Sequence, residues 1–554
     1  MQDMEWWKKT ILYECYPKSF FDHKDQGSGT IKGIITKLDY LKSLGVGALW
    51  LTPVYRSPMV DNGYDVADYY QIDPQYGTME DMDELISEAR KRDIRIVMDL
   101  VFNHSSDQCA WFLESKKSKD NPKSDWYVWA DPDEFGRAPT NWRALFGGSA
   151  WKWCEERKQY YLHTFAVEQP DLNWENPEVR KALFDVANFW VNKGVGGFRI
   201  DAISYIKKPK EFKNGISDGF DGLSDINRIC RNQEGILDFL KEFKDEVKKG
   251  KDIFLVGETN GVDPEELRKW VGEDGVFDMV IEFTHVSPEF AEGENWWKPN
   301  AWNLSGFKKN INAFQYAVNE FGWHPIYFEN HDKPRSVNHY FSEYCDKKKA
   351  AKVIATLLMS LRGTPFLYQG QEIGMSNVSW DDIDEYDDLS SHVQYQTALK
   401  EGASEVEALK GVHRSSRDNA RTPMQWSDEI NAGFSKGNPW LKVNSNYREV
   451  NRKVEESDAG SVLNYYRCLK KLRDEHPALI DGKFKSYEDD SDDVYIYDRT
   501  DDKEKIRVMV NFKDRDVKID PQYEENSSVL LCSLPEHETG KLKALESLIL
   551  QIDK

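Results

Sequence analysis

Three carboxylic acids stand at the ends of apolar segments of this chain: Asp201 ends GFRID, Glu258 ends IFLVGE, and Asp332 ends IYFENHD. Where such segments are neighbouring strands, crowded carboxyl groups repel one another, which raises the pKa of at least one of them. Arg199 precedes Asp201 by two residues, so strand alternation places both side chains on one side, where the cation keeps the carboxylate ionised. An ionised carboxylate beside a protonated one is the equipment for retaining cleavage of a glycosidic bond.

Strand-end polar residues also have a structural use. A lone Asp at the end of a strand commonly caps a helix or closes a turn, and Asn103-His104, after the segment that contains Asp99, is typical of a satisfied turn. Residue types and spacing therefore leave a catalytic role and a capping role open.

Eight short apolar segments alternate with helical patterns along the chain, for example the helix predicted over 79–92. Strands separated by helices pair in parallel through right-handed crossovers, and eight such units fit a closed (β/α)8 barrel of the α/β class better than an open sheet. A barrel gathers the carboxyl ends of its strands at one mouth, which would bring the three carboxylates together. The predicted strands are residues 11–17, 48–53, 94–101, 197–202, 253–258, 279–283, 325–332 and 364–370.

Two parts of the chain break the barrel pattern. Roughly ninety residues rich in Trp, Asp, Asn, Pro and Gly separate the third strand from the fourth, which is too long for a loop and predicts a small inserted domain. After about residue 480 the apolar residues alternate with polar ones, which predicts a C-terminal antiparallel β domain. The predicted divisions are barrel residues 1–103, inserted domain 104–172, barrel remainder 173–478 with a polar surface excursion near 375–460, and a C-terminal β-sandwich 479–554.

The composition excludes several classes of partner. Lys and Arg number 74 against 96 Asp and Glu, and the net charge of -22 repels nucleic acids and anionic membranes. No run of about 18 apolar residues occurs, and the N-terminus lacks a secretory signal pattern, so we expect a cytoplasmic protein. The seven scattered cysteines contain no CxxC pair and favour reduced thiols over a zinc site. A small-molecule substrate remains as the expected partner, and a monomer is favoured.

The motifs of this chain resemble those of the alpha-amylase superfamily, glycoside hydrolase family 13, and specifically its oligo-1,6-glucosidase and alpha-glucosidase branch. The matching segments occur in the family's order and cover nearly the whole chain. They are NGYD at 62–65, DLVFNH at 99–104, FGGSAW at 146–151, QPDLN at 169–173, GFRID at 197–201, VGE at 256–258, ENHD at 329–332 and SRDNARTPMQW at 416–426. Several motifs in order are far more specific than any one alone.

The resemblance implies a (β/α)8 barrel with a B domain after the third strand, a C-terminal β domain, and an exo-acting retaining alpha-glucosidase. By the same resemblance Asp201 is the nucleophile that forms a covalent glucosyl-enzyme, and Glu258 is the general acid/base. Asp332 is the third carboxylate, which binds the sugar hydroxyls and helps to distort the ring.

The resemblance also implies a set of substrate-binding residues. Asp61 and an arginine of the SRDNAR segment would grip the non-reducing end of the substrate, with Arg417 favoured over Arg421. The implied binding residues are Asp61, Tyr64, His104, Phe146, Arg199, His331 and Arg417.

The loop after the first strand departs from the family's pattern. Relatives often carry a calcium loop of the form DxNxDGxGD, whereas residues 22–30 read DHKDQGSGT, with Lys24, Gln26 and Thr30 at ligand positions. A loop that loses oxygen ligands and gains an ammonium is unsuited to a hard divalent cation. We therefore expect no metal and no other cofactor, with Lys24 supplying the positive charge.

A second departure follows the expected nucleophile. Family members that act on alpha-1,6 bonds usually carry Val at the position of Ala202 and those that prefer alpha-1,4 bonds Thr, and Thr259-Asn260 replaces the Met-Pro common in alpha-1,6 enzymes. We expect activity on alpha-1,6-linked, isomaltose-type oligosaccharides, with tolerance for other alpha linkages or for sucrose-type substrates.

Three alternatives stay open beside this interpretation. A sucrose isomerase uses the same carboxylates but carries an RLDR-type segment, where this chain has only KPR at 333–335. A trehalose-6-phosphate hydrolase is the second, since Lys333 near the mouth would suit a phosphate. The non-catalytic heavy chains of amino-acid transporters are the third, but they need a membrane anchor and often lack the three carboxylates. Hydrolysis is therefore preferred.

Overall fold

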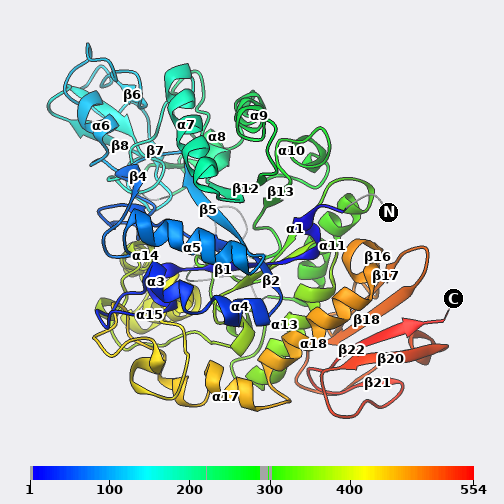
Figure 1. The fold of residues 1–554 in the computed structure, drawn as a ribbon. Coiled ribbons are helices and arrows are strands. Elements are labelled where there is room, and N and C mark those ends of the chain that lie inside the picture. The colour runs from blue at the N-terminus through cyan, green and yellow to red at the C-terminus, as the bar shows by residue number, and fades with distance from the viewer. Residues whose placement is uncertain (1–3, 220, 287–296, 298–301, 554) are drawn as a thin grey trace. The chain divides into compact units, whose positions relative to one another are not determined.

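A computed structural model describes residues 4–219, 221–286, 297 and 302–553 of the chain (Figure 1). It contains an eight-stranded parallel sheet with the strand order β13-β12-β10-β5-β2-β1-β15-β14, and the fold is the predicted α/β barrel. The strands are β1 Ile11–Cys15, β2 Val46–Leu51, β5 Arg95–Val101, β10 Gly197–Asp201, β12 Phe254–Glu258, β13 Met279–Ile281, β14 Pro325–Ile326 and β15 Thr364–Tyr368. Each of the eight predicted strands is thereby found.

The chain divides into two compact units. The first unit comprises Met1–Leu49, Glu88–Ile94 and Thr284–Lys554, and the second comprises Trp50–Ser87 and Arg95–Phe283. Within the second unit β10 pairs in parallel with β5 and with β12, and in the first unit β15 pairs in parallel with β1 and with β14. The domain limits expected from the sequence remain predictions.

One predicted strand is much shorter than expected. The sequence pattern predicted residues 325–332, but β14 ends at Ile326. Further along this segment the backbone bonds with side chains instead of a neighbouring strand: the Asn330 side chain accepts from the Asp332 amide at 2.9 Å, and Glu14 accepts from the His331 amide at 3.2 Å. An apolar run predicts burial equally well for a strand and for a buried turn, so the pattern could not distinguish them.

The longer helices of the barrel have the expected amphipathic pattern and ordinary caps. In α5, Met82, Leu85 and Ala89 are fully buried along one face. The α7 helix begins with Asn176, whose side chain accepts from the Glu178 amide, and it ends at Gly194 in the left-handed conformation that glycine tolerates. These helices are α5 Met79–Lys91, α7 Pro177–Lys193, α9 Ile236–Val247, α11 Leu304–Glu320, α13 Lys347–Ser360 and α18 Val462–Glu475.

Shorter helices lie in the connections. They are α1 Trp6–Lys9, α2 Pro17–Phe20, α3 Ile31–Ile35, α4 Leu38–Ser43, α6 Ala110–Ser115, α8 Asn227–Cys230, α10 Leu267–Trp270, α12 Ser336–His339, α16 Asp418–Arg421, α17 Arg452–Ser457 and α19 Pro477–Asp481. The polar stretch expected to be a surface excursion forms two further helices, α14 Leu389–Lys400 and α15 Glu405–Ser415. The α15 helix begins with a capping box between Ser404 and Glu407, which stabilises the start of a helix in this polar stretch.

Small sheets follow the third barrel strand, as predicted for an inserted domain. A three-stranded antiparallel sheet has the order β6-β9-β8, formed by Trp129–Ala130, Gln159–Leu162 and Trp151–Cys154. A second pair joins β7 Trp142–Arg143 to β11 Ser224–Asp225, which comes after the fourth barrel strand. Before the third barrel strand, β3 Tyr55–Arg56 pairs antiparallel with β4 Asp68–Ile72. Trp142, Trp151 and Leu162 form part of a separate apolar core beneath these strands.

The C-terminal part is an antiparallel β domain, as predicted (Figure 1, orange to red). Its main sheet has the order β16-β17-β18-β22-β20, and β19 pairs with β21. The strands are β16 Lys483–Tyr487, β17 Val494–Thr500, β18 Lys505–Asn511, β19 Val517–Lys518, β20 Ser527–Cys532, β21 Lys541–Leu542 and β22 Ser547–Ile552. Among the described residues, no helix is both long and apolar enough to cross a membrane.

Candidate active site

One buried arginine organises the carboxylates of the second unit. The register of the sheet sets Arg199 on β10 directly beside Asp99 on β5. Nη1 of Arg199 donates to both carboxylate oxygens of Asp99, at 2.8 and 3.0 Å, and to Oδ1 of Asp201 at 2.7 Å. Its Nη2 lies 2.9 Å from Oε2 of Glu258. A single guanidinium therefore connects three carboxylates that are up to 159 positions apart in the sequence, from 99 to 258.

The three carboxylates differ in their access to a ligand. Asp99 is fully buried, whereas the side chains of Asp201 and Glu258 remain 10% and 14% exposed. Burial disfavours the charged guanidinium, but the surrounding carboxylates prevail and raise the pKa of Arg199 well above its usual range. Arg199 is therefore a permanent cation, and Asp201 and Glu258 are the two members of the cluster that can reach a substrate.

The backbone after Asp201 takes part in the cluster. The Ala202 amide donates to Oε2 of Glu258 at 2.9 Å, and Ala202 has a left-handed conformation with φ of 47°. A residue with a Cβ adopts this region at a cost of order 1–3 kcal/mol, which the surrounding packing must hold. The strained residue thus aims its amide at the carboxylate expected to be the acid/base.

Asp99 was not among the residues expected in the site, although its motif was. Besides Arg199, its Oδ2 accepts from the Tyr64 hydroxyl at 3.0 Å and from Trp50 Nε1 at 3.2 Å. The burial of Asp99 and these donors make it a positioning residue for Arg199 and Tyr64. The sequence did offer one indication of Asp99, a carboxylate inside an apolar strand. Its partner Arg199 could not be predicted, because their pairing depends on the register of β5 and β10.

His104 and Asp61 share a polar network with Gln169. His104 Nε2 lies 3.1 Å from the Tyr64 carbonyl oxygen, and burial lowers the pKa of His104 to about 4, so the ring is neutral at pH 7. The Gln169 side-chain amide donates to Oδ2 of Asp61 at 3.2 Å and to the same carbonyl at 3.3 Å. Gln169 is a residue whose motif was noted but whose role was not.

Phe146, one of the expected binding residues, reaches this network through a second aromatic ring. Phe146 is half-buried, and its ring packs edge-on against Phe165 with centroids 5.8 Å apart. Phe165 in turn lies 5.0 Å from the His104 ring. Lys208 Nζ and Asp171 Oδ2 form a buried pair 2.8 Å apart; Asp171 belongs to the QPDLN motif, whereas Lys208 was not singled out by any sequence pattern.

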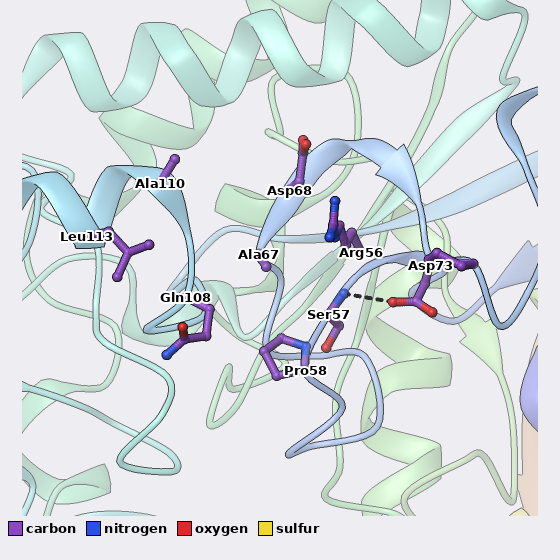
Figure 2. Close-up of a pocket in the computed structure, with 10 residues that line it drawn as sticks. Arg56, Ser57, Pro58, Ala67, Asp68, Asp73, Gln108, Ala110 and Leu113 are labelled. Atoms are coloured by element: carbon purple, nitrogen blue, oxygen red, sulfur yellow. Dashed lines mark hydrogen bonds between the residues drawn. The ribbon is translucent and has the colours of Figure 1, made fainter.

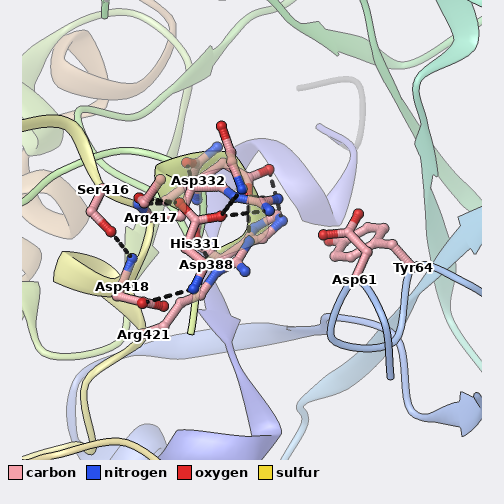
Figure 3. Close-up of polar contacts among 12 residues, drawn as sticks. Asp61, Tyr64, His331, Asp332, Asp388, Ser416, Arg417, Asp418 and Arg421 are labelled. Atoms are coloured by element: carbon pink, nitrogen blue, oxygen red, sulfur yellow. Dashed lines mark hydrogen bonds and ion pairs between the residues drawn. The ribbon is translucent and has the colours of Figure 1, made fainter. Parts of the chain in front are cut away.

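A second cluster, around Asp332, belongs to the first unit (Figure 3). His331 lies between two carboxylates, with Nδ1 2.6 Å from Glu14 Oε1 and Nε2 3.1 Å from Asp332 Oδ2. Burial opposes a charged ring, but the two carboxylates raise the pKa of His331 to about 9. Burial also opposes an ionised Asp332, yet His331, Arg421 and Arg417 hold its pKa well below the usual range. Both groups are therefore charged at neutral pH.

The two candidate arginines make different contacts in this cluster. Arg421 is fully buried, donates through Nη2 to Asp332 Oδ1 at 2.7 Å, and donates through Nε to the His331 carbonyl at 3.0 Å. Arg417 keeps 13% of its side chain exposed and lies 3.5 Å from the same Asp332 oxygen. Its Nε and Nη2 both lie 2.8 Å from Oδ1 of the buried Asp388, which no sequence pattern had indicated.

Replacing Glu14 with glutamine should shift the alkaline limit of activity. The neutral amide no longer stabilises the imidazolium, so the pKa of His331 falls from about 9 by roughly 1–3 units. Above that pKa the neutral His331 ring of the variant turns a lone pair either toward the side chain at position 14 or toward Asp332. We expect kcat/KM to fall at a correspondingly lower pH, measured as a pH profile of both enzymes.

The Glu14→Gln substitution should also lower the stability of the fold, and by more at low pH than at high pH. A raised folded pKa of His331 contributes stability fully below the unfolded value of about 6.5, and this contribution is lost as pH rises through about 9. The difference in Tm between wild type and Glu14→Gln should therefore be larger at pH 6 than at pH 10. Glu504→Gln, which removes the carboxylate 2.7 Å from His476, is the matched control and should leave the activity profile unchanged. Identical profiles for the Glu14 variant and wild type would contradict the assignment.

In the loop at 22–30, the carboxylate of Asp22 accepts hydrogen bonds from groups of the protein itself. Asp22 accepts from the amides of Lys24 and Gly27 at 2.9 and 2.6 Å and from the Ser435 hydroxyl at 2.7 Å. The Lys24 side chain is exposed, so these amides and this hydroxyl, not the ammonium, stabilise the carboxylate. Thr30 caps α3 by accepting from the Gly33 amide at 3.1 Å.

Calcium should therefore have no effect on stability. Three donors already point at the Asp22 oxygens, and a calcium ion needs six to eight oxygen ligands that are free of such donors. We expect the same Tm in millimolar calcium and in excess chelator, by differential scanning calorimetry. A calcium-dependent rise in Tm that disappears in Asp22→Asn would overturn this expectation.

A separate cavity of about 550 Å³ lies in the second unit (Figure 2). Its wall includes Arg56, Ser57, Asp73 and Leu113, and the Ser57 amide donates to Asp73 at 3.2 Å. None of the expected site residues lines this cavity, so we assign it no part in the reaction.

A parallel (β/α)8 barrel whose strands end in arginine-bridged carboxylates is the architecture of a glycosidase-type enzyme. The family model for the alpha amylase catalytic domain matches residues 14–482, and the chain belongs to this family, glycoside hydrolase family 13. It is accordingly an enzyme of the class of alpha-glucoside hydrolases and transglucosylases.

Relatives within the family have different printed activities. The chain is 42% identical to an oligo-1,6-glucosidase of Heyndrickxia coagulans, over 99% of this chain and 100% of the relative. It is 41% identical to a trehalose-6-phosphate hydrolase of Bacillus subtilis (strain 168), over 92% and 90% of the two chains. Among solved structures, the isomaltulose synthase SmuA from Protaminobacter rubrum is 39% identical with a TM-score of 0.93, covering 100% of both chains.

Proposed function

We propose that this protein is an exo-acting retaining alpha-glucosidase that releases glucose from the non-reducing end of short alpha-glucosides, chiefly alpha-1,6-linked, isomaltose-type oligosaccharides. The observation that carries the proposal is the Arg199 guanidinium, which contacts Asp201 at 2.7 Å and Glu258 at 2.9 Å. Two carboxyl groups on neighbouring nitrogens of one guanidinium are close together, as a retaining pair with its separation of about 5–5.5 Å requires.

The proposed reaction uses the two carboxyl groups in turn. A carboxylate oxygen of Asp201 attacks the anomeric carbon while Glu258 gives its proton to the glycosidic oxygen, so the carbon–oxygen bond breaks and the leaving sugar departs. Glu258 then takes a proton from water, whose oxygen displaces Asp201 from the glucosyl-enzyme. The Arg199 guanidinium, 2.7 Å from Asp201, places a positive charge beside the carboxylate that acts as the nucleophile.

The remaining expected residues are proposed to bind the glucose. Asp332 and His331 are charged at neutral pH and suit hydroxyl groups as acceptor and donor, while the aromatic rings suit the apolar sugar face. Arg417 is favoured for the non-reducing end because it keeps exposed surface, whereas buried Arg421 is engaged with Asp332. We propose the binding set Asp61, Tyr64, His104, Phe146, His331, Asp332 and Arg417.

Hydrolysis is favoured over isomerisation by the state of Arg335. This arginine, in the KPR segment, is fully buried, with Nη1 3.1 Å from Glu329 and 2.7 Å from the Gln369 carbonyl. It is therefore occupied in packing and not free to hold a leaving fructose for rebonding. The trehalose-6-phosphate alternative keeps Lys333 as its support from the sequence.

A product-resolved assay on a panel of alpha-glucosides tests the proposal. We expect the highest kcat/KM on isomaltose, lower values on maltose, sucrose and trehalulose, and free glucose as the product in each case. Formation of isomaltulose or trehalulose from sucrose would contradict the proposed hydrolysis and support the isomerase alternative. Strict preference for maltose, or for trehalose 6-phosphate, would overturn the linkage assignment while leaving the family intact.

A further inference from the structure

A cavity in the first unit carries an unusual excess of positive charge. It has a volume of about 420 Å³, and we call it the Lys37 pocket. Its wall brings together the α3–α4 connection, the segment after α16, and helices α17 and α18. The lining residues that matter for the argument are Lys37, Tyr40, Trp426, Arg452, Glu456 and Arg467. None of the residues proposed for the glucosidase reaction lines it.

Lys37 is a half-buried cation without a counter-ion. Its Nζ lies 3.7 Å from the ring centre of Phe21 and 4.4 Å from that of Trp426, and it has no hydrogen-bond acceptor or ion-pair partner among the described residues. Burial, together with the charge of Arg452, lowers the pKa of Lys37 to about 8. Ring faces offset only part of the lost hydration of an ammonium, so the site holds a positive charge that an anion would stabilise.

The other cations of the pocket share one carboxylate. Arg467 Nη1 lies 2.9 Å from Glu456, and Arg452 Nη2 lies 3.1 Å from the same side chain. Nε of Arg452 is buried and has no hydrogen-bond partner in the part of the chain that the structure describes. The remaining acid on the wall, Asp39, pairs with Arg92 at 2.6 Å outside the pocket. Three cations therefore face one available carboxylate.

This arrangement contrasts with the chain as a whole, whose net charge is -22. Like charges near a half-buried site destabilise it unless a ligand of opposite charge relieves the repulsion. An arginine N–H donor beside an ammonium is the donor set that recognises phosphate oxygens. The volume of the pocket falls within the range of about 300–1,000 Å³ that is usual for small-molecule sites.

We propose that the Lys37 pocket binds a phosphate group, with the Lys37 ammonium and the guanidinium of Arg452, whose side chain is 37% exposed, as its donors. The source of the group is inorganic phosphate or the phosphate ester of a small sugar. Arg467 and Glu456 form the fixed wall, since their charges are already paired. The site is separate from the proposed glucosidase function and does not depend on it.

Binding can be measured by isothermal titration calorimetry and thermal shift on the full chain. Inorganic phosphate and glucose 6-phosphate are titrated separately, with glucose and sodium chloride of equal ionic strength as blanks. We expect each phosphate compound to bind and to raise the Tm, and Lys37→Met to weaken binding at least tenfold. If glucose 6-phosphate binds more tightly than inorganic phosphate through Lys37, the ligand is a sugar phosphate; equal affinities indicate the free ion.

The control variant is Lys42→Met, which removes an exposed lysine of α4 that pairs with Asp93 at 3.5 Å. It should bind phosphate like wild type. Weaker binding by Lys37→Met than by Lys42→Met would then show that phosphate binds in the Lys37 pocket and is not attracted by general surface charge or bound at the sugar site. Arg452→Gln provides a second test in case Lys37→Met does not fold. Equal affinity in wild type and in folded Lys37 and Arg452 variants, or no phosphate-dependent heat and Tm shift in wild type, would overturn the proposal.

Discussion

Replacing Asp201 with asparagine should reduce kcat by about 10,000-fold or more, because the amide cannot form the covalent glucosyl-enzyme. The asparagine is isosteric and can still accept from Arg199 Nη1, which lies 2.7 Å from the present carboxylate, so the fold should persist. Rates on an aryl alpha-glucoside, with near-ultraviolet circular dichroism as the folding check, measure both effects. Activity of the asparagine variant within tenfold of wild type would contradict the assignment.

Azide rescue distinguishes the nucleophile from the acid/base. In Asp201→Gly, azide enters the vacated face and displaces the leaving group directly, so the product is the inverted beta-glucosyl azide. In Glu258→Ala the glucosyl-enzyme still forms on Asp201, and azide then attacks from the opposite face, which yields alpha-glucosyl azide. The reverse pairing of product and variant would exchange the two roles.

Replacing Arg199 with methionine should lower the free energy of unfolding by about 3–5 kcal/mol, since it leaves buried carboxylates without their cation. Asp99 is fully buried, and Asp201 and Glu258 lie within 3 Å of the guanidinium nitrogens, so all three lose their shared partner. Urea unfolding at neutral pH measures the change. Arg199→Lys should recover part of it, because a lysine restores the charge but not the forked set of donors.

Arg95→Met is the matched control for this prediction. Arg95 is also at a strand of the sheet and lies 2.7 Å from Asp252, but this pair is exposed to solvent. Exposed ion pairs contribute less than about 1 kcal/mol, so the variant should be close to wild type. Equal stability of the Arg199 and Arg95 variants would mean that the carboxylates around Arg199 do not depend on its charge.

Much of the barrel could be predicted from local pattern. Each of its strands is a short apolar run, and burial on both faces of a parallel sheet makes such runs nearly continuous in sequence. Asp201 and Glu258 were expected at strand ends, and they are the last residues of β10 and β12. Side chains two residues apart in a strand point to the same face, so Asp201 shares a face with Arg199 and Glu258 with Val256. This follows from the strand itself and requires no knowledge of the neighbouring strands.

The strands and the chemical groups at their ends can therefore be predicted from the sequence, because periodicity and residue type are local properties. Which of these groups meet depends on the three-dimensional fold, because strand register and helix packing join distant positions. Asp99 is the partner of Arg199 through the register of β5 and β10, and Glu14 on β1 stabilises the charged ring of His331, which lies outside any strand. The Lys37 pocket likewise arises from segments hundreds of residues apart, whose charges carry no common signal until the fold brings them together.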